Sequence, residues 1–196
     1  RDRSMPPLGS YMIWKTQRLA PDRKWLAQVY PQLAKWHTYW MKNRDGNGAG
    51  LLSSSSNTVE YEFPQLVPYN QKLPHTRQSA MYESGLDNSP LFDGVEFDEQ
   101  TNCLKAYDVA LCSFYAMDCE CLACIAEFLG KKADAKRYRI EHAQMAERIN
   151  AQLWDEERGL YCNRHWDGRF AEHLAPTSLF PLIAGVATPE RAQRMV

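Results

Sequence analysis

The stretch "LKAYDVALCSFYAMDCECLACIAEFLG", residues 104–130, decides the fold class of this chain. Apolar side chains recur on one helical face through Leu111 and Leu122, and the opposite face carries Val109 and Phe114. A helix that is apolar nearly all round is buried on most of its faces, and Gly130 ends it. The following stretch, 133–154, keeps a single apolar stripe and is otherwise rich in Lys, Arg, Glu and Gln. These patterns predict a buried helix covered by an exposed one.

The first half of the chain repeats this alternation. An apolar segment over residues 8–19 precedes Asp22, which can cap a second helix with a polar outer face. Pro31 should bend or interrupt that second helix near Tyr30. Alternating buried and exposed helices predict an all-α fold, a toroid of helical hairpins.

A long irregular region, residues 44–103, separates the two helical pairs. Compact domains seldom carry so long a connection without a functional reason, so we expect functional loops at one end of the hairpins. At the other end of the sequence, Thr188 and Pro189 begin a further helix as N-cap and first-turn residue. The pattern supplies about two hairpins and the start of a third, so we expect residues 1–196 to be part of a larger domain, truncated at both ends.

Composition restricts the partners. The chain has 196 residues, 44% of them hydrophobic, and a formal net charge of -1. That charge provides no basic field for nucleic acid, and no apolar run approaches the roughly 18 residues of a membrane span. We therefore expect neither nucleic acid nor a membrane as partner.

The six cysteines lack the paired spacing of zinc modules. Four of them lie within 104–129, where Cys behaves as a small hydrophobic residue. We expect reduced core cysteines, which favours a cytoplasmic setting. The alternative is a redox or metal role for the CxxC of Cys121 and Cys124.

The segment "MYESGLDNSPLFDG", residues 81–94, places the carboxylates of Glu83 and Asp87 four residues apart in a stretch that we do not expect to form a regular helix. One interpretation is a solvated turn, since Asp and Asn favour turns. The other is a rigid loop that presents a carboxylic acid to a substrate, with Gly85 allowing a sharp turn and Pro90 stiffening the exit.

The block "ESGLDNSP", residues 83–90, resembles the signature loop of the clan G glycoside hydrolases. These are the six-hairpin (α/α)6-barrel enzymes of glycoside hydrolase family 63 and its relatives, including mannosylglycerate hydrolase-like and glucosylglycerate hydrolase-like enzymes and, more distantly, trehalases. "MPPLGSYMIWK", "VYPQLAKWHTYWMKNRDGNGAGLL" and "APTSLFPLIAGVATPERAQRMV" are similar to family blocks and occur in the family's order. The resemblance implies that residues 1–196 are a partial (α/α)6-barrel catalytic domain.

The resemblance also implies a role for Asp87, that of general acid in an inverting glycoside hydrolase acting on α-glucosides or α-mannosides, glycosyl-glycerates among them. Inversion needs a protonated carboxyl at the leaving oxygen and a second carboxylate about 6.5–9.5 Å away to activate water. The acid works best in a partly dry pocket that raises its pKa. The family's base belongs to the C-terminal part of the barrel, and Glu127 and Glu172 match no base motif. We therefore expect this chain to need the rest of its own catalytic domain and to be inactive alone.

Several residues near the signature loop are candidates for binding the carbohydrate. Glu83 can bind a sugar hydroxyl or hold the loop by accepting backbone N–H groups. Aromatic rings can cover the C–H faces of a sugar, whereas Trp36 and Trp40 fall on a core stripe and are expected to pack. The predicted substrate-binding residues are Glu83, Tyr82, Asn88, Phe92 and Trp14.

No cofactor is expected, with calcium near Asp45 and Asn47 as the alternative. These two residues alternate as in an EF-hand loop, but Ala49 and Ser56 occupy positions that need oxygen ligands, the last of them a bidentate Glu. The pattern fails as an EF-hand, and a Gly-rich turn is the simpler interpretation.

Two other functions stay open. The first is a non-catalytic helical-hairpin domain that binds carbohydrate or protein. The second is a trehalase-like enzyme, although "LDNSPLFD" lacks the aromatic residue before the Asp and the serines of the trehalase form. For the apolar helix, the resemblance implies that Asp108 supports the site from the helix start, and Asp118 is expected to be a structural group.

Overall fold

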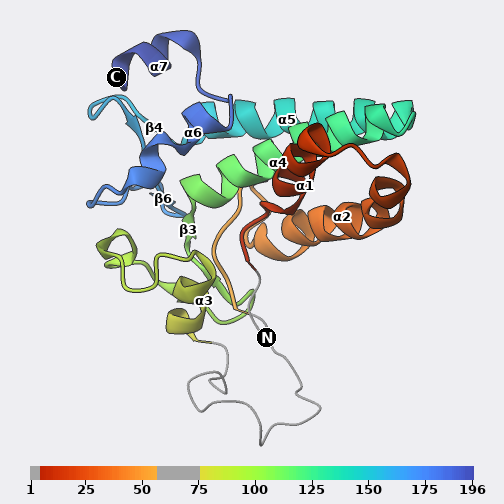
Figure 1. Ribbon diagram of the computed structural model, residues 1–196. Helices are drawn as coiled ribbons and strands as arrows, with labels where there is room; N and C mark the ends of the chain where they lie inside the picture. The colour runs from red at the N-terminus through yellow and green to blue at the C-terminus, as the bar shows by residue number, and fades with distance from the viewer. Residues whose placement is uncertain (1–4, 57–75) are drawn as a thin grey trace, which may run out of the picture.

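A computed structural model describes residues 5–56 and 76–196 of the protein, which form paired helices with short strands at one end (Figure 1). The helices are α1 (Gly9–Leu19), α2 (Arg23–Arg44), α3 (Arg77–Glu83), α4 (Val109–Phe128), α5 (Lys132–Gln152), α6 (Phe180–Ile183) and α7 (Pro189–Arg194), with 3-10 turns η3 (Pro90–Phe92) and η4 (Pro176–Leu179). The strands are β1 (Phe97–Asp98), β2 (Cys103–Leu104), β3 (Ala106–Tyr107), β4 (Trp154–Asp155), β5 (Leu160–Tyr161) and β6 (Arg164–His165). They pair antiparallel as β1–β2, β3–β6 and β4–β5.

Helix α4 is the centre of the core, as its all-round apolar pattern predicted. Fifteen of its twenty residues are buried, and α1, α2, α5 and α6 pack against it. The helix starts later than residue 104, because β2 and β3 precede it and Asp108 caps it. The Asp108 Oδ1 atom accepts hydrogen bonds from the amides of Ala110 and Leu111 at 2.8 and 3.2 Å.

The prediction that no apolar run approaches the length of a membrane span is wrong for this helix. Val109–Phe128 is long and apolar enough to cross a membrane by length and composition. However, 83% of the qualifying window is buried against other parts of the protein. A helix at the centre of a protein core passes the same test, and the packing of α4 is that of a core helix.

Helices α2 and α5 cover α4 from outside. On α5 only one stripe is buried, which contains Tyr138, Met145 and Ile149. Asp22 caps α2 as predicted, accepting a hydrogen bond from the amide of Trp25 at 2.9 Å. Pro31, predicted to bend or interrupt α2, does not interrupt it, because α2 is continuous from Arg23 to Arg44. Tyr30 and Leu33, on either side of the proline, are buried in the core, and this packing offsets the lost backbone hydrogen bond.

A buried histidine joins α2, α4 and α5. The His37 Nδ1 atom lies 2.7 Å from Asp118 Oδ2, and its Nε2 atom lies 2.8 Å from Glu141 Oε2. Burial lowers the pKa of His37, but the hydrogen bonds with Asp118, Cys119 and Glu141 outweigh it and raise the pKa to about 11. Asp118 therefore has the structural role expected of it.

The region between the helical pairs is more ordered than predicted. It contains α3, η3, β1 and β2, while residues 57–75 of the predicted loop lie outside the described residues. Residues 51–56 are all buried and run beside 102–108. Backbone bonds from Leu104 N to Ser54 O and from Asp108 N to Leu52 O, both 2.8 Å, join the two segments.

Helix α7 and the cysteines agree with the sequence, whereas α1 is not the buried helix predicted over residues 8–19, because only Ser10 and Gln17 on it are buried. Thr188 caps α7, accepting from the amide of Arg191 at 3.3 Å. All six cysteines are free, and five of them are buried, with Cys124 partly exposed.

Candidate active site

The candidate acid loop begins at α3, which lies near the N-terminal end of α4 (Figure 1). Thr76 caps α3 by accepting a hydrogen bond from the amide of Ser79 at 3.1 Å. Glu83 is the last residue of α3, so the first carboxylate of the motif is helical, contrary to the expectation of an irregular segment. The second carboxylate, that of Asp87, follows in the turn after the helix.

Glu83 forms a bidentate ion pair with Arg44 at the end of α2. The Arg44 Nε and Nη2 atoms donate to Glu83 Oε2 and Oε1 at 2.7 and 2.6 Å. The amide of Ser55 also donates to Oε2 at 2.8 Å. Glu83 is 1% exposed. These contacts are those of a residue that holds the loop. They include a hydrogen bond from a backbone N–H group, as predicted for that role. Glu83 is therefore too buried to contact a carbohydrate.

Arg44 is itself held by aromatic rings. Its guanidinium lies 5.0 Å from the ring centroid of Tyr39 and 5.9 Å from that of Trp40. Burial lowers the pKa of Arg44, and the charge of Glu83 and the hydrogen bond to it raise the pKa above its ordinary value. The pair therefore stays charged while it joins α2 to α3.

Asp87 lies at the exposed tip of the loop in a left-handed backbone conformation. Its φ is 42°, and that of Gly85 is 75°. The amide of Ser89 donates to the carbonyl of Leu86 at 2.9 Å, which closes a turn around Asp87. This conformation costs most residues other than Gly about 1–2 kcal/mol, and it costs Asp and Asn less. Such local strain concentrates at functional sites. Among the described residues, the Asp87 side chain makes no hydrogen bond or ion pair.

The exit of the loop is anchored in the protein interior. The Ser89 side chain accepts from the amide of Leu91 at 3.2 Å and starts η3. Arg77 of α3 donates to the carbonyls of Val95, at 2.9 Å, and of Phe92. Phe92 is 2% exposed and packs with Met81 and Val95. The prediction that Phe92 stacks on a sugar is therefore wrong, because its ring fills the core beneath the loop.

The other predicted binding residues are spread over the molecule. Tyr82 is partly exposed on α3, one residue before Glu83. Asn88 is exposed beside Asp87 and accepts from Gln78 Nε2 at 3.1 Å. Trp14 lies elsewhere, with its ring 6.3 Å from that of Phe128 in an edge-to-face contact. Since Phe128 ends α4 and α4 spans about 30 Å, the structure does not bring Trp14 to the loop.

Asp108 supports the loop from the start of α4. Besides capping the helix, its Oδ2 atom accepts from the Ser54 hydroxyl at 3.1 Å. Burial raises the pKa of the Asp108 carboxyl, against the hydrogen bonds from Leu111, Ser54 and Ala110. Ser54 neighbours Ser55, which binds Glu83, so residues 51–56 connect the helix start to the acid loop.

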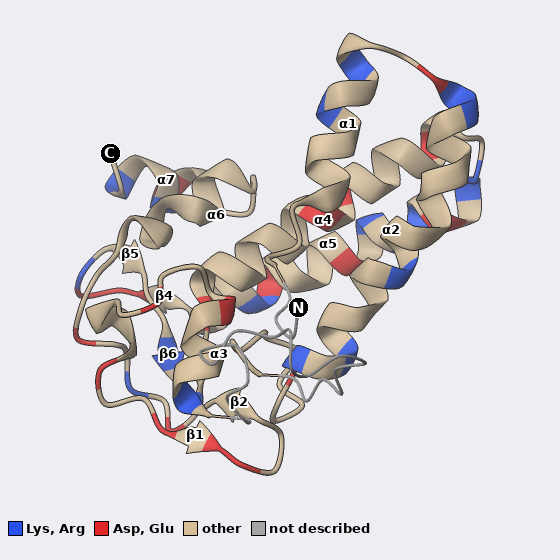
Figure 2. Ribbon diagram, turned by 60° about the horizontal axis from the view of Figure 1, so that its bottom comes forward, with Lys and Arg blue, Asp and Glu red and all other residues tan. Residues whose placement is uncertain are grey.

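A pocket of about 810 Å³ opens beside the exit of the loop. Asp93, Asp155, Arg158 and Glu172 are among its lining residues, and Figure 2 shows acidic segments in the loops around β1 and β4. The His173 Nε2 atom lies 3.8 Å from Asp93 Oδ2, so His173 also lies beside the exit of the loop. Asp87 is not among the residues that line this pocket, and we do not assign the acid chemistry to the pocket.

Asp45 and Asn47, the calcium candidates, form a turn after α2. The Asp45 Oδ2 atom accepts from the amide of Gly50 at 3.0 Å. Asn47 accepts from the amide of Ala49 at 3.3 Å and donates to the Tyr107 hydroxyl at 2.7 Å. The described contacts are those of a Gly-rich turn.

Sequence reasoning missed Arg44 and the four serines of residues 53–56. Arg44 has the appearance of a charged residue at the end of an exposed helix, and a run of serines is typical of a solvated loop. The sequence did offer one signal of a buried Arg44. This basic residue lies on the apolar side of α2, four residues after Trp40, and the paired leucines 51 and 52 follow it.

The arrangement of helices is that of known helical-barrel glycosidases. The structure of mannosylglycerate hydrolase from Thermus thermophilus, of glycoside hydrolase family 63, is similar over 98% of this chain and 50% of that chain, with a TM-score of 0.73 and 19% identity. Neutral trehalase Nth1 from Saccharomyces cerevisiae gives a TM-score of 0.72 at 20% identity, over 98% of this chain and 43% of that chain. This confirms the predicted fold, part of a toroid of helical hairpins.

The family is established by sequence. Residues 1–196 match the model of the mannosylglycerate hydrolase MGH1-like glycoside hydrolase domain, and the chain belongs to this family. Periplasmic trehalase from Pseudomonas aeruginosa is 28% identical over 98% of this chain and 40% of its own length. Mannosylglycerate hydrolase from Rubrobacter radiotolerans is 25% identical over 97% of this chain and 50% of its own length. The chain spans 40–50% of the length of these two relatives.

Proposed function

We propose that the full-length protein is an inverting glycoside hydrolase that cleaves α-glucosides or α-mannosides, with Asp87 as its general acid. The observation that carries the proposal is the left-handed, exposed Asp87 at the tip of a loop fixed on both sides. The Arg44–Glu83 pair fixes the entry, and Arg77 and Phe92 fix the exit. A general acid needs such fixation, because proton transfer requires a defined position relative to the leaving oxygen.

The family and the relatives support this reaction class. Relatives named mannosylglycerate hydrolase and trehalase act, by their names, on glycosides of glycerate and on trehalose. Both substrates are small, so the proposed substrate class is a short α-linked glycoside. The remaining candidates for sugar contacts are Asn88, which follows Asp87 and is exposed, and Tyr82, which is partly exposed in the last turn of α3.

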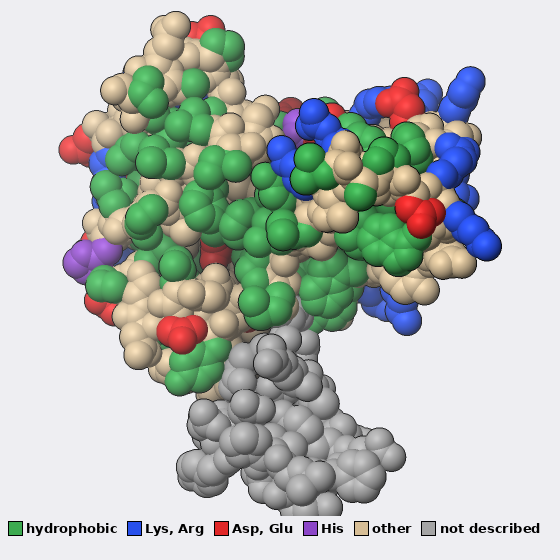
Figure 3. Space-filling view, in the orientation of Figure 1, with side chains coloured by type: hydrophobic (Ala, Val, Ile, Leu, Met, Phe, Trp, Pro, Cys, Tyr) green, Lys and Arg blue, Asp and Glu red, His purple; other side chains and the backbone are tan. Residues whose placement is uncertain are grey.

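In this proposal, the rest of the catalytic domain completes the site. Asp87 is exposed in this chain, whereas a working general acid is partly shielded from water. A base carboxylate must also lie about 6.5–9.5 Å across the cleft for inversion. Figure 3 shows hydrophobic side chains spread over a broad area of one face, and Met12 and Ile183 are 61% and 66% exposed. Large exposed apolar areas indicate a partner surface, which further barrel helices would supply.

The experiment compares the full-length protein with Asp87→Asn on a panel of substrates: α-glucosides, α-mannosides, trehalose and glycosyl-glycerates. We expect kcat to fall by about 10²- to 10⁴-fold in Asp87→Asn, and NMR to detect the inverted anomer as first product in the wild type. Asp93→Asn, another exposed carboxylate of the same region, is the matched control and should keep its activity. Nearly intact activity in Asp87→Asn would refute the assignment, and carbohydrate binding without hydrolysis would favour a binding domain.

A further inference from the structure

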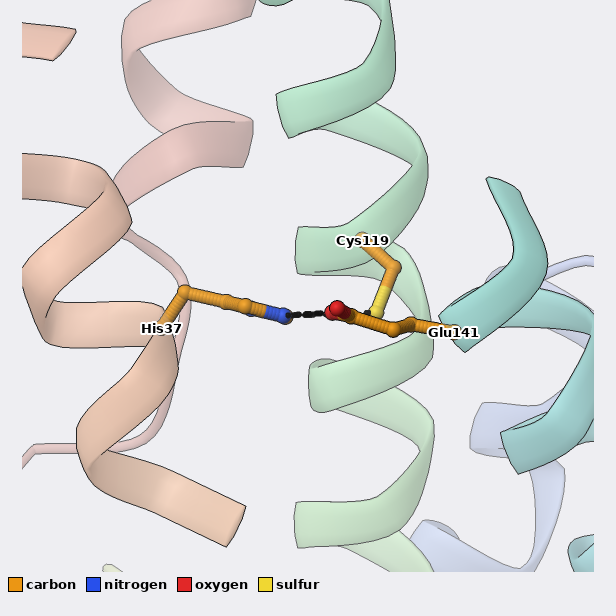
Figure 4. A group of neighbouring side chains, drawn as sticks. All are labelled: His37, Cys119 and Glu141. Carbon is orange, nitrogen blue, oxygen red and sulfur yellow. Dashed lines mark hydrogen bonds and ion pairs between the residues drawn. The ribbon is translucent and has the colours of Figure 1, made fainter. Parts of the chain in front are cut away.

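Three side chains of types that bind metal ions meet where α2, α4 and α5 pack together. His37, Cys119 and Glu141 each come from a different helix and point toward one another (Figure 4). Their ligand atoms all lie within 4.8 Å of one another. The His37 Nε2 atom is 2.8 Å from Glu141 Oε2 and 3.8 Å from Cys119 Sγ. The proposed hydrolysis uses none of the three.

The donor set selects the class of ion. One nitrogen, one sulfur and one oxygen suit zinc, whereas calcium and magnesium prefer sites made only of oxygen. Zinc bonds of about 2.0–2.3 Å in a tetrahedron separate neighbouring ligand atoms by roughly 3.3–3.8 Å. The distance from Sγ to Nε2 already fits. Glu141, whose side chain is 26% exposed, needs to move from Nε2 by roughly half an ångström to reach that spacing.

The imidazole is already oriented for metal binding. Asp118 Oδ2 lies 2.7 Å from His37 Nδ1, which leaves Nε2 directed at Cys119 and Glu141. Carboxylate–histidine–metal arrangements of this kind fix the tautomer and orientation of the ligand. Tyr115 stacks on the imidazole at 4.4 Å, and Tyr138 contacts it edge-on at 5.3 Å. The ring is therefore confined by packing as well as by hydrogen bonding.

Charge and access also suit a divalent ion. A Cys119 thiolate, Glu141 and Asp118 would bring three negative charges, which a divalent cation and the Arg137 guanidinium, 3.4 Å from Glu141, would balance. A pocket of about 370 Å³, lined by Thr38, Met41 and Lys42 together with His37 and Glu141, opens at the site. It gives access to the site from the side of His37 and Glu141.

We propose that His37, Cys119 and Glu141 bind one Zn²⁺ ion, with Asp118 orienting the histidine and water completing a tetrahedron. The ion replaces the proton on Nε2 and the proton of the thiol, so binding releases protons. It links three helices, and α2 also carries Arg44, which holds the acid loop. The site is therefore structural, and its ion is expected to stabilise the hairpin packing beside the candidate active site.

The test uses the full-length protein, freed of metal with a chelator and titrated with Zn²⁺ by calorimetry and with Co²⁺ by absorption spectroscopy. We expect one Zn²⁺ per chain, a rise in Tm, and a thiolate-to-Co²⁺ charge-transfer band in the near ultraviolet. Cys119→Ser should abolish the band and weaken Zn²⁺ binding at least tenfold. Asp118→Asn should keep the band and weaken binding about 10- to 100-fold.

Cys121→Ser is the matched control, because Cys121 is buried on the same helix two residues away and should keep both band and affinity. If Cys119→Ser does not fold, Glu141→Gln, at a partly exposed position, tests the same site through weaker Zn²⁺ binding. Absence of Zn²⁺ binding would overturn the proposal. His37 would then be a protonated imidazolium that is hydrogen-bonded to Asp118 and Glu141. A band lost in Cys121→Ser and kept in Cys119→Ser would overturn it too, by placing the metal at the CxxC pair.

Discussion

Arg44 and Glu83 form a buried ion pair with two parallel hydrogen bonds, from Nε to Oε2 at 2.7 Å and from Nη2 to Oε1 at 2.6 Å. Each residue is 1% exposed. Arg44 ends α2, and Glu83 ends α3, four residues before Asp87. This contact between elements that are distant in the sequence thus anchors the entry of the candidate acid loop to the helical core.

Glu83→Ala should lower the free energy of unfolding by about 3–5 kcal/mol, because it leaves the Arg44 charge buried without its partner. Activity of the full-length protein should fall as well, since the loop loses its anchor at the entry. Urea denaturation of the full-length protein measures the first effect, and hydrolysis of the active substrate measures the second.

The control for this prediction is Glu127→Ala. Glu127 pairs with Arg139 at 2.5 Å on the protein surface, where ion pairs contribute little. This variant should unfold at nearly the wild-type denaturant concentration. Equal losses in both variants would show that burial of the Arg44–Glu83 pair is not what makes it important.

Asp87 should be replaceable by Asn without loss of stability, since Asn tolerates the left-handed conformation at φ 42°. Asp87→Ala should lower the free energy of unfolding by about 1 kcal/mol, because Ala bears the full steric cost of that conformation. Thermal unfolding of both variants beside the wild type provides the comparison. A stable Asp87→Ala and an unstable Asp87→Asn would contradict the strained-turn geometry.

Pro31→Ala should stabilise the protein by about 1–3 kcal/mol. Pro31 is exposed in the interior of α2, where proline removes a backbone hydrogen bond and crowds the preceding turn. Pro189→Ala offers the matched comparison, because Pro189 starts α7 and costs nothing in a first turn. The measurement is the difference in denaturation midpoint between the two variants. A destabilised Pro31→Ala would show that Pro31 does not weaken the interior of α2.

Asp108→Ala should cost about 2 kcal/mol or more, because the amides of Ala110 and Leu111 and the Ser54 hydroxyl lose a buried acceptor. Asp108→Asn retains a capping oxygen and should cost less. Removing the Thr188 cap, which serves the short helix α7, should have a smaller effect than Asp108→Ala. Denaturation curves for the three variants give the order, and a reversed order would argue against the support role of Asp108.

Much of the architecture could be predicted from local pattern. The all-round apolar sequence of α4 and the single stripe of α5 gave a buried helix and its cover, and Asp22 and Thr188 marked helix starts correctly. The boundaries of α4 were less accurate, because Leu104, Ala106 and Tyr107 are apolar but pair as strands. Apolar periodicity does not distinguish a short buried strand from the first turn of a buried helix.

Sequence alone determined the fold class, the order of the hairpins, the family resemblance and the loop that carries Asp87, because each depends on residues close together in the chain. Only the tertiary structure decided that Glu83 binds Arg44, 39 residues away, and that Phe92 fills the core. It also brought together His37, Cys119 and Glu141 from three helices. The physical reason is that the partner of a buried charge or ring is set by how helices pack, and helical periodicity specifies which face is buried but not which residue it meets.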